Sequence, residues 1–185
     1  MSTISLRRDH DLIEKVIKSM ETTVHLLESG KKIPESILNP VIDFSKNFTD
    51  VCHHTKEEKS LFPALGKAGM PTHMGPIAKM LMEHEETRKI GNSMEESANN
   101  YFNTDDATQL IADMKEYVEH VTEHLWKENN RLFMMAEARL QNVSKQVDDE
   151  LNQIEKIKLE EIGKTRDHYE QIEKEFSKKI SKEFS

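Results

Sequence analysis

The chain has 185 residues, of which 36% are hydrophobic and 32% are charged, and its formal net charge is −8. This negative charge argues against a nucleic-acid partner, because the phosphate backbone is also negative. No signal-peptide pattern follows Met1 and no apolar run is long enough to span a membrane, so we expect a cytoplasmic protein with no membrane partner. The single cysteine, Cys52, cannot form an internal disulfide, which fits a reducing cytoplasm.

Apolar residues at helical spacing predict a first helix over about residues 5–29, which ends before Pro34. His10 lies at the edge of its apolar face. A second helix begins near Pro34 or Pro40 and ends at about Leu65, before a loop rich in glycine and proline.

The third helix should begin at Pro76, which suits a first helical turn, and end at about Ser97. His84 lies near the centre of its apolar face. Thr104 or Asp105 is expected to cap the helix that comes next. The connection between the two helices is polar and contains Asn99, Asn100 and Asn103.

The fourth helix carries a stripe of apolar residues and candidate ligands. Its members are Leu110, Met114, Tyr117, Val121, His124, Glu128 and Leu132. Four helices with short connections favour antiparallel neighbours, so we predict an all-α fold with an up-down-up-down four-helix bundle over residues 1–140. Residues 141–185 are predicted to be an amphipathic helical extension, formed by two additional C-terminal helices that are broken at Gly163. A continuous coiled-coil extension of the fourth helix is the alternative.

One motif occurs twice. His53 and Glu57 are four residues apart, as are His124 and Glu128, and both copies read His-x-x-Lys-Glu with Leu-Phe four residues after the glutamate. Residues four apart lie on the same face of a helix, so each pair can bind the same metal ion. Two such motifs on separate helices are what a two-metal site in a helical bundle needs.

Every predicted helix of the bundle offers a histidine on or near its inward face. These histidines are His10, His53 or His54, His84 and His124. Imidazole and carboxylate donors suit iron, manganese or zinc, and the lack of cysteine ligands argues against an iron–sulfur cluster. A single histidine is more often an ordinary packed or surface residue, which is our interpretation of His25, His73 and His168. The coincidence across four helices favours metal binding.

The chain resembles the hemerythrin-like, or HHE cation-binding, proteins over nearly its whole length. The matching segments are Asp9-His10, Cys52-His53-His54-x-x-Glu57-Glu58 with Leu61-Phe62-Pro63, Gly75-Pro76-Ile77, Glu83-His84 with Arg88, and His124-x-x-Lys127-Glu128-Asn129. The resemblance implies two iron ions in an oxo- or hydroxo-bridged centre, with manganese or zinc less favoured. Matched by position, the metal ligands would be His10, His53, Glu57, His84, His124 and Glu128, with the two glutamates bridging.

The chain departs from the pattern of hemerythrin-type oxygen carriers on the third helix. Those proteins supply a further histidine four residues before the position of His84, where this chain has Met80. The resemblance therefore favours a more reactive site over reversible oxygen carriage. His120, one turn before His124, is a candidate substitute for the missing histidine.

Two signals disagree about the second helix. A period of 3.6 residues continued from Phe44, Phe48 and Val51 turns His54 and Glu58 inward. The repeated motif and the family pattern point instead to the residues one position earlier, His53 and Glu57. We follow the repeat, because a bulge in the helix would shift the phase of the stripe. His54 is then a buried neighbour of the site or an additional ligand.

These features predict a non-haem di-iron protein that binds or reacts with a small oxidant such as dioxygen, peroxide or nitric oxide. Whether it is an enzyme is left open, and an oxidoreductase of peroxidase or catalase type is one form the activity would take. The alternatives are an iron or oxygen sensor, with the C-terminal helices as relay and as the contact of a homo-oligomer, and a protein for iron storage or delivery in the repair of iron centres. A metal-free helical interaction protein is the remaining alternative.

Overall fold

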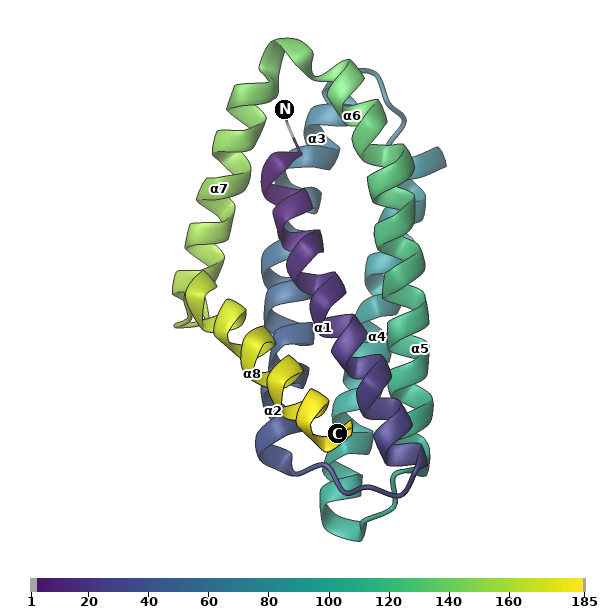
Figure 1. Cartoon of the computed structure of the whole chain (residues 1–185). Coiled ribbons are helices and arrows are strands. Elements are labelled where there is room, and N and C mark those ends of the chain that lie inside the picture. Colours follow the sequence, from purple (N-terminus) through teal and green to yellow (C-terminus); the bar gives the residue numbers. More distant parts are fainter. Residues whose placement is uncertain (1–2, 185) are drawn as a thin grey trace.

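The computed structural model describes residues 3–184, and it is built from helices that form an elongated bundle (Figure 1). Helices make up 88% of the structure, and no strand occurs in the described part of the chain. Four long helical rods lie side by side and are joined by short connections. The prediction of an all-α, four-helix bundle with additional C-terminal helices is confirmed.

Two of the four rods are single α-helices, and the other two change their winding part-way. The first rod is α1 (Ile4–Glu28) and the third is α4 (Gly75–Thr104). The second rod contains α2 (Glu35–Asp43), two π-helical segments (Phe44–His54 and Glu57–Leu61) and α3 (Phe62–Lys67). The fourth rod contains α5 (Thr108–Lys127), one π-helical segment (Glu128–Leu132) and α6 (Phe133–Arg139).

The third rod is longer than the sequence predicts. Helix α4 continues beyond Ser97 to Thr104, so the prediction of a polar connection through the three asparagines Asn99, Asn100 and Asn103 is wrong. The helix continues because Ala98 and Tyr101 are buried in the core, and the Tyr101 hydroxyl accepts a hydrogen bond from the Ile33 backbone N–H. The asparagines lie on the solvent side of the same turns.

The predicted cap of the fourth helix is also wrong. Asp105 has a φ of 62° and ends α4 instead of starting the next helix. Helix α5 begins at Thr108, whose backbone N–H donates a hydrogen bond to the Asp106 carboxylate at 2.9 Å. Aspartate tolerates this left-handed conformation better than most residues, and its side chain bonds readily to the backbone two residues on.

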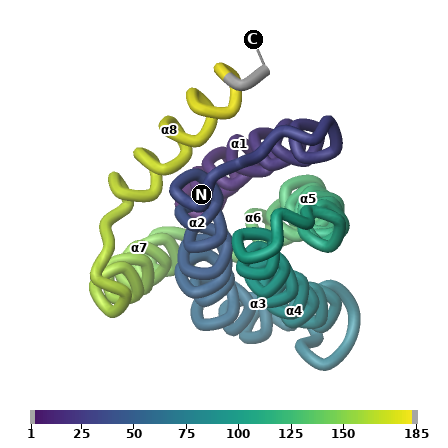
Figure 2. The backbone as a smooth tube through the Cα atoms, turned by 90° about the horizontal axis from the view of Figure 1, so that it is seen from below, coloured from purple at the N-terminus to yellow at the C-terminus, as the bar shows by residue number. Residues whose placement is uncertain are grey.

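Two further helices, α7 (Ser144–Glu161) and α8 (Arg166–Phe184), follow a 3₁₀ turn. They are broken at Gly163, as predicted, where a φ of 65° suits glycine. Helix α7 runs along the second rod and α8 crosses α1, so both cover one side of the bundle (Figures 1 and 2). Helix α8 adds to the main core of the bundle the side chains of Tyr169, Ile172, Phe176 and Ile180. A homo-oligomer through these helices, and the division into domains at residue 140, stay predictions.

The buried apolar side chains form two clusters, one toward each end of the bundle. The larger cluster draws on every rod, with members that include Ile13, Phe48, Ile90 and Val121. The smaller cluster includes Leu6, Leu61, Met80 and Leu132. Along each rod, the residues between these two sets include the candidate ligands. The fold therefore places a polar layer inside the bundle, closed off by apolar packing on both sides.

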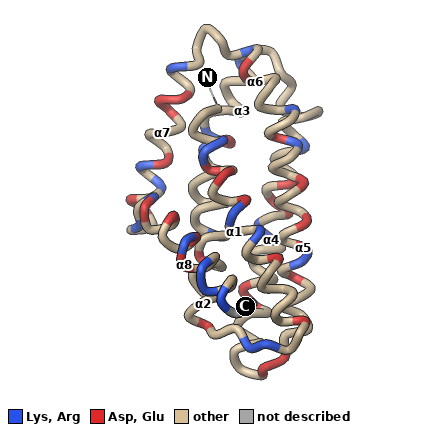
Figure 3. Tube along the Cα trace, viewed as in Figure 1, with Lys and Arg blue, Asp and Glu red and all other residues tan. Residues whose placement is uncertain are grey.

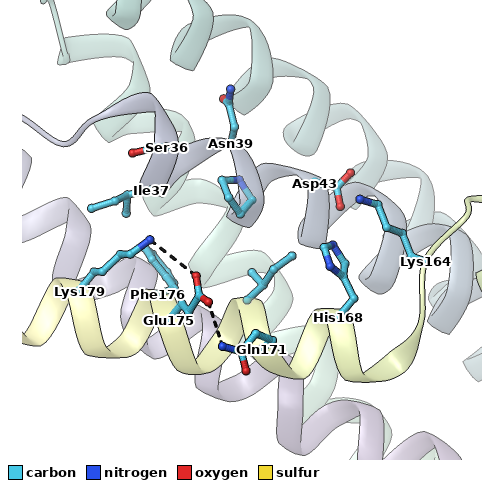
Figure 4. A pocket seen from close by; sticks show the side chains of 12 residues that line it. Ser36, Ile37, Asn39, Asp43, Lys164, His168, Gln171, Glu175, Phe176 and Lys179 are labelled. Carbon is cyan, nitrogen blue, oxygen red and sulfur yellow. Dashed lines mark hydrogen bonds and ion pairs between the residues drawn. The ribbon is translucent and has the colours of Figure 1, made fainter.

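The surface of the bundle is polar and carries both signs of charge. Figure 3 shows basic and acidic residues interspersed along the helices. Within residues 3–184, no helix combines the length and the apolar composition needed to cross a bilayer. A groove of about 430 Å³ opens between α2 and α8, with Ile37, Asp43, His168 and Phe176 among its lining residues (Figure 4). None of the candidate ligands lines this groove.

Candidate metal centre

The six side chains expected as metal ligands converge in the polar layer. Each of them is at most 1% exposed to solvent. All four rods contribute to the set, which consists of His10, His53, Glu57, His84, His124 and Glu128. Burying this many ionisable groups is unfavourable unless they are paired or bind a metal. The arrangement therefore needs a partner for its charges.

The winding of the second rod explains why the apolar stripe and the repeated motif disagree about which residues face inward. One row of fully buried residues on this rod has intervals of four or five positions: Phe44, Phe48, His53, Glu57 and Leu61. A period of 3.6 residues runs instead through Val51, which is only half-buried. The longer interval is what π-helical winding produces, and π-helical turns are frequent at functional sites. The repeated motif matches the observed inward register, and Glu128 in its second copy also begins a π-helical segment.

Glu57 lies between histidines of two different rods. Its Oε2 atom is 3.8 Å from the Nε2 atom of His53, on the same rod, and 3.3 Å from the Nε2 atom of His84, on α4. A single oxygen atom of the Glu57 carboxylate therefore lies close to both histidines. This is the position that a ligand bridging two metal ions would take.

Glu128 repeats this geometry from the opposite rod. Its Oε2 atom is 3.5 Å from Nε2 of His124 and 3.2 Å from Nε2 of His10 on α1. The Nε2 atom of His10 is in turn 3.1 Å from that of His53. The centre thus contains two histidine pairs, His10 with His53 and His84 with His124. The carboxylates of both glutamates contact one histidine of each pair.

In residues 3–184 the potential ligand atoms form three groups, and two of these groups contain both Glu57 and Glu128. Within each group the atoms lie no more than 4.8 Å from one another, and the two groups consist of His10, His53, Glu57 and Glu128, and of Glu57, His84, His124 and Glu128. Atoms that share one ion through bonds of about 2.0–2.2 Å are separated by at most about 4.4 Å. The limit of 4.8 Å for the two groups is slightly above this separation, and both glutamates are common to them.

Several atoms at the centre have no hydrogen-bond partner within the described part of the chain. They are both carboxylate oxygens of Glu57, both of Glu128, and the Nε2 atoms of His84 and His124. A buried acceptor without a donor costs roughly 1–3 kcal/mol, and a charged one costs more. A metal site requires oxygen and nitrogen atoms that face one another without hydrogen bonds between them, because each lone pair is then available to the metal ion. The residues present therefore fit metal cations.

The outward nitrogen of each histidine is held by an oxygen acceptor. In all four cases the Nδ1–H group donates, which leaves the Nε2 lone pair directed at the centre. The pairs are His10 with Asn129 at 2.9 Å, His53 with Asp9 at 3.2 Å, His84 with Glu58 at 2.8 Å and His124 with Glu83 at 3.0 Å. These partners fix the tautomer and the orientation of each ring.

The lysine of the first motif has a role that the sequence analysis missed. Lys56 is completely buried, and its Nζ atom donates hydrogen bonds of 2.7 Å to Ser5, Asp9 and Glu155. Asp9 is also the acceptor for His53. The lysine thus neutralises the acid that orients a candidate ligand, and it joins α1 and the second rod to α7.

The second motif repeats this arrangement in a more exposed form. Lys127 Nζ donates to Glu83 at 2.8 Å, and Glu83 accepts from His124. In both copies the lysine contacts an acid that directly precedes a candidate ligand histidine on a neighbouring helix. The lysine common to both motifs, and the two acid–histidine dipeptides Asp9-His10 and Glu83-His84, were signals in the sequence that pointed to this pairing.

The protein environment shifts the ionisation of the central groups. Burial raises the pKa of Glu128, but the positive charges of His124 and neighbouring imidazoles outweigh it and lower this pKa to about 2. Burial lowers the pKa of His84, but the carboxylates of Glu57 and Glu58 outweigh it and raise this pKa to about 9. Protons and metal ions therefore compete for the same lone pairs.

Comparison with known families agrees with this geometry. The family model of the hemerythrin HHE cation binding domain matches residues 3–136, which is more than half of the chain. The chain belongs to the hemerythrin HHE cation-binding family. No curated protein and no solved structure matches it. The family match reaches from the first rod into α6 of the fourth rod and ends before α7, so this HHE domain is a cation-binding bundle with two helices beyond it.

Three further histidines of the HHE domain, His120, His25 and His73, have different surroundings. His120, the predicted substitute for a missing ligand, directs its Nε2 atom at the Glu83 backbone carbonyl at 3.0 Å, and it belongs to none of the ligand groups found in residues 3–184. His25 and His73 are exposed, as expected for ordinary surface residues. Met80 is packed in the smaller apolar cluster.

Proposed function

We propose that this HHE domain holds two iron ions bridged by Glu57 and Glu128, and that the centre binds or reacts with a small oxidant such as dioxygen, peroxide or nitric oxide. The remaining ligands would be His10 and His53 for one ion, and His84 and His124 for the other. The observation that carries the proposal is the position of the two carboxylates, each between histidines of both pairs.

The chemistry of the donor set supports iron. Four imidazoles and two carboxylates are donors of intermediate hardness, which suits iron and excludes metals that require thiolates. Two shared carboxylates also offset the repulsion between two cations held close together. Carboxylate-bridged di-iron sites in other helical bundles use the same combination of inward glutamates and histidines.

Iron would supply redox change and Lewis acidity, and the chain supplies orientation and a dry environment. Phe133 stacks on the His10 ring with a centroid distance of 5.0 Å, and Phe62 stacks on the His84 ring at 5.7 Å. Each phenylalanine follows one copy of the repeated motif, so the two Leu-Phe pairs close the centre against water. Exclusion of water protects a bound oxidant from side reactions.

The first test is the iron content of the protein. The metal-free protein should take up two ferrous ions per chain without oxygen, and exposure to the oxidant should then produce near-ultraviolet charge-transfer bands. Glu57→Gln should bind at most one ion and lose these bands, because a neutral amide is a weak metal ligand and a poor bridge. Elemental analysis and absorption spectroscopy measure both effects.

An exposed glutamate on α5 provides the control. Glu119→Gln removes the same charge at the surface and should leave the iron content at the wild-type value. The proposal fails if the wild-type protein takes up zinc in place of iron, or if Glu57→Gln holds two iron ions as tightly as the wild type.

Turnover separates an enzyme from a binder. Continuous loss of peroxide with the loaded protein, absent in Glu57→Gln, would indicate a peroxidase- or catalase-type oxidoreductase. A spectral change that stops after one equivalent would indicate a binder or a sensor. We place the protein in a reducing cytoplasm, on the support of its single free cysteine, Cys52, and such a compartment would return the iron to the ferrous state.

A further inference from the structure

A fifth buried histidine adjoins the candidate centre. His54 is 1% exposed, and a ligand atom of its ring lies within 4.8 Å of those of His84 and His124. The His54 ring stacks on the His84 ring with a centroid distance of 3.9 Å and an interplanar angle of 7°. The centroid distance from His54 to His124 is 5.6 Å. The three imidazoles therefore meet at one end of the centre.

His54 has the same outward contact as the four candidate ligand histidines. Its Nδ1 atom is 3.2 Å from the Asp50 carboxylate, so the Nδ1–H group donates and the Nε2 lone pair stays available. Arg88 donates to Asp50 at 2.8 Å and to Glu58 at 2.7 Å. Because Glu58 holds the outward nitrogen of His84, one guanidinium fixes the acceptors of both stacked rings.

His120 shows the opposite pattern. Its Nε2 atom, which would have to face the metal, is occupied by the Glu83 backbone carbonyl. It is only half-buried and shares no ligand group with His84 or His124 in the described part of the chain. Within residues 3–184, His54 has a ligand atom grouped with those of His84 and His124, and His120 does not.

We infer that His54 is a third imidazole ligand of the ion held by His84 and His124. The inference rests on the proposed function and refines it, because the two metal positions become unequal. One ion has three imidazoles and the other has the two imidazoles of His10 and His53. With both glutamates shared, the second ion would have one protein ligand fewer than the first.

The test is ferrous binding to full-length variants that keep the shape of the site. His54→Phe retains an aromatic ring that can stack on His84 but has no ring nitrogen. Titration of the metal-free protein with ⁵⁷Fe²⁺ under anaerobic conditions should leave one ion bound normally and weaken the other by about 10–100-fold or more. In the Mössbauer spectrum, the signal of one iron should change or disappear while the other keeps its wild-type parameters.

His120→Phe is the matched control and should bind two ions with wild-type parameters. If His54→Phe lowers the helical content measured by circular dichroism, His54→Gln replaces it, because its side chain can still contact Asp50. The inference is wrong if the wild type loads two ions and the folded His54 variant binds both with unchanged affinity and unchanged spectra. A wild-type protein that does not load two ions contradicts the proposed function itself.

Discussion

At the scale of single residues, each candidate ligand histidine is oriented by a hydrogen bond from its Nδ1–H group to an oxygen atom outside the centre. Two of the candidate histidine ligands were visible in the sequence as a repeat, because His53 and Glu57 have the same spacing as His124 and Glu128. The oxygen atoms that accept from the Nδ1–H groups of the histidines could not be found from periodicity. Each of these hydrogen bonds, except that of His54, joins two different helices. Lys56 illustrates the difficulty, because a lysine beside two glutamates is usually a solvated residue, and here it is completely buried.

Removal of one outer acceptor should weaken metal binding without removing a ligand. Asn129→Ala deletes the oxygen that accepts from His10 Nδ1, so the ring loses its fixed tautomer and orientation. We expect the affinity for one of the two ions to fall by about 10–100-fold. Competition with a chelator, monitored during anaerobic ferrous titration, measures this change.

The neighbouring residue provides the control for this prediction. Asn130 is exposed, and its side-chain amide donates a hydrogen bond to the Trp126 backbone carbonyl on the same rod. Asn130→Ala should therefore leave both affinities unchanged. Equal losses in the two variants would mean that the helix end, and not the contact with His10, determines the affinity.

Individual elements deviate from the sequence prediction where tertiary contacts override local pattern. The π-helical winding of the second rod places His53 and Glu57 inward, although the upstream apolar stripe favoured their neighbours. The repeat of the motif and the family pattern indicated this register, whereas apolar periodicity did not. Helix α4 likewise continues through three asparagines, because Ala98 and Tyr101 on its other face are buried.

The contact between α7 and the bundle depends on Lys56. Lys56→Met leaves the carboxylates of Asp9 and Glu155 buried with less compensating charge, although Arg166 still bonds to both. Removal of one member of a buried ionic network costs about 3–5 kcal/mol. We therefore expect the free energy of unfolding of the metal-free protein, measured with urea, to fall by that amount.

An exposed lysine on the same rod, Lys59, provides the comparison for Lys56→Met. Lys59→Met changes an exposed lysine three residues further on and should alter the free energy of unfolding by less than about 0.5 kcal/mol. If Lys56→Met is as stable as Lys59→Met, the buried network does not hold α7 and α8 in place.

The whole molecule is a bundle whose interior alternates between apolar and polar layers. The number of rods, their order and the break at Gly163 followed from apolar spacing and from the positions of glycine and proline. The path of α8 did not, because its apolar residues fit self-association as well as packing on α1, and sequence alone does not choose between them. In the structure Tyr169 and Phe176 are buried in the core shared with α1 and α2.

The central claim is that two metal ions lie between the histidine pairs and share Glu57 and Glu128. An anomalous difference map at the iron edge, from crystals of the iron-loaded full-length protein, tests it most directly. We predict two peaks, one beside His10 and His53 and the other beside His84 and His124, each about 2.0–2.2 Å from a glutamate oxygen. A single peak, or peaks outside the polar layer, would contradict it.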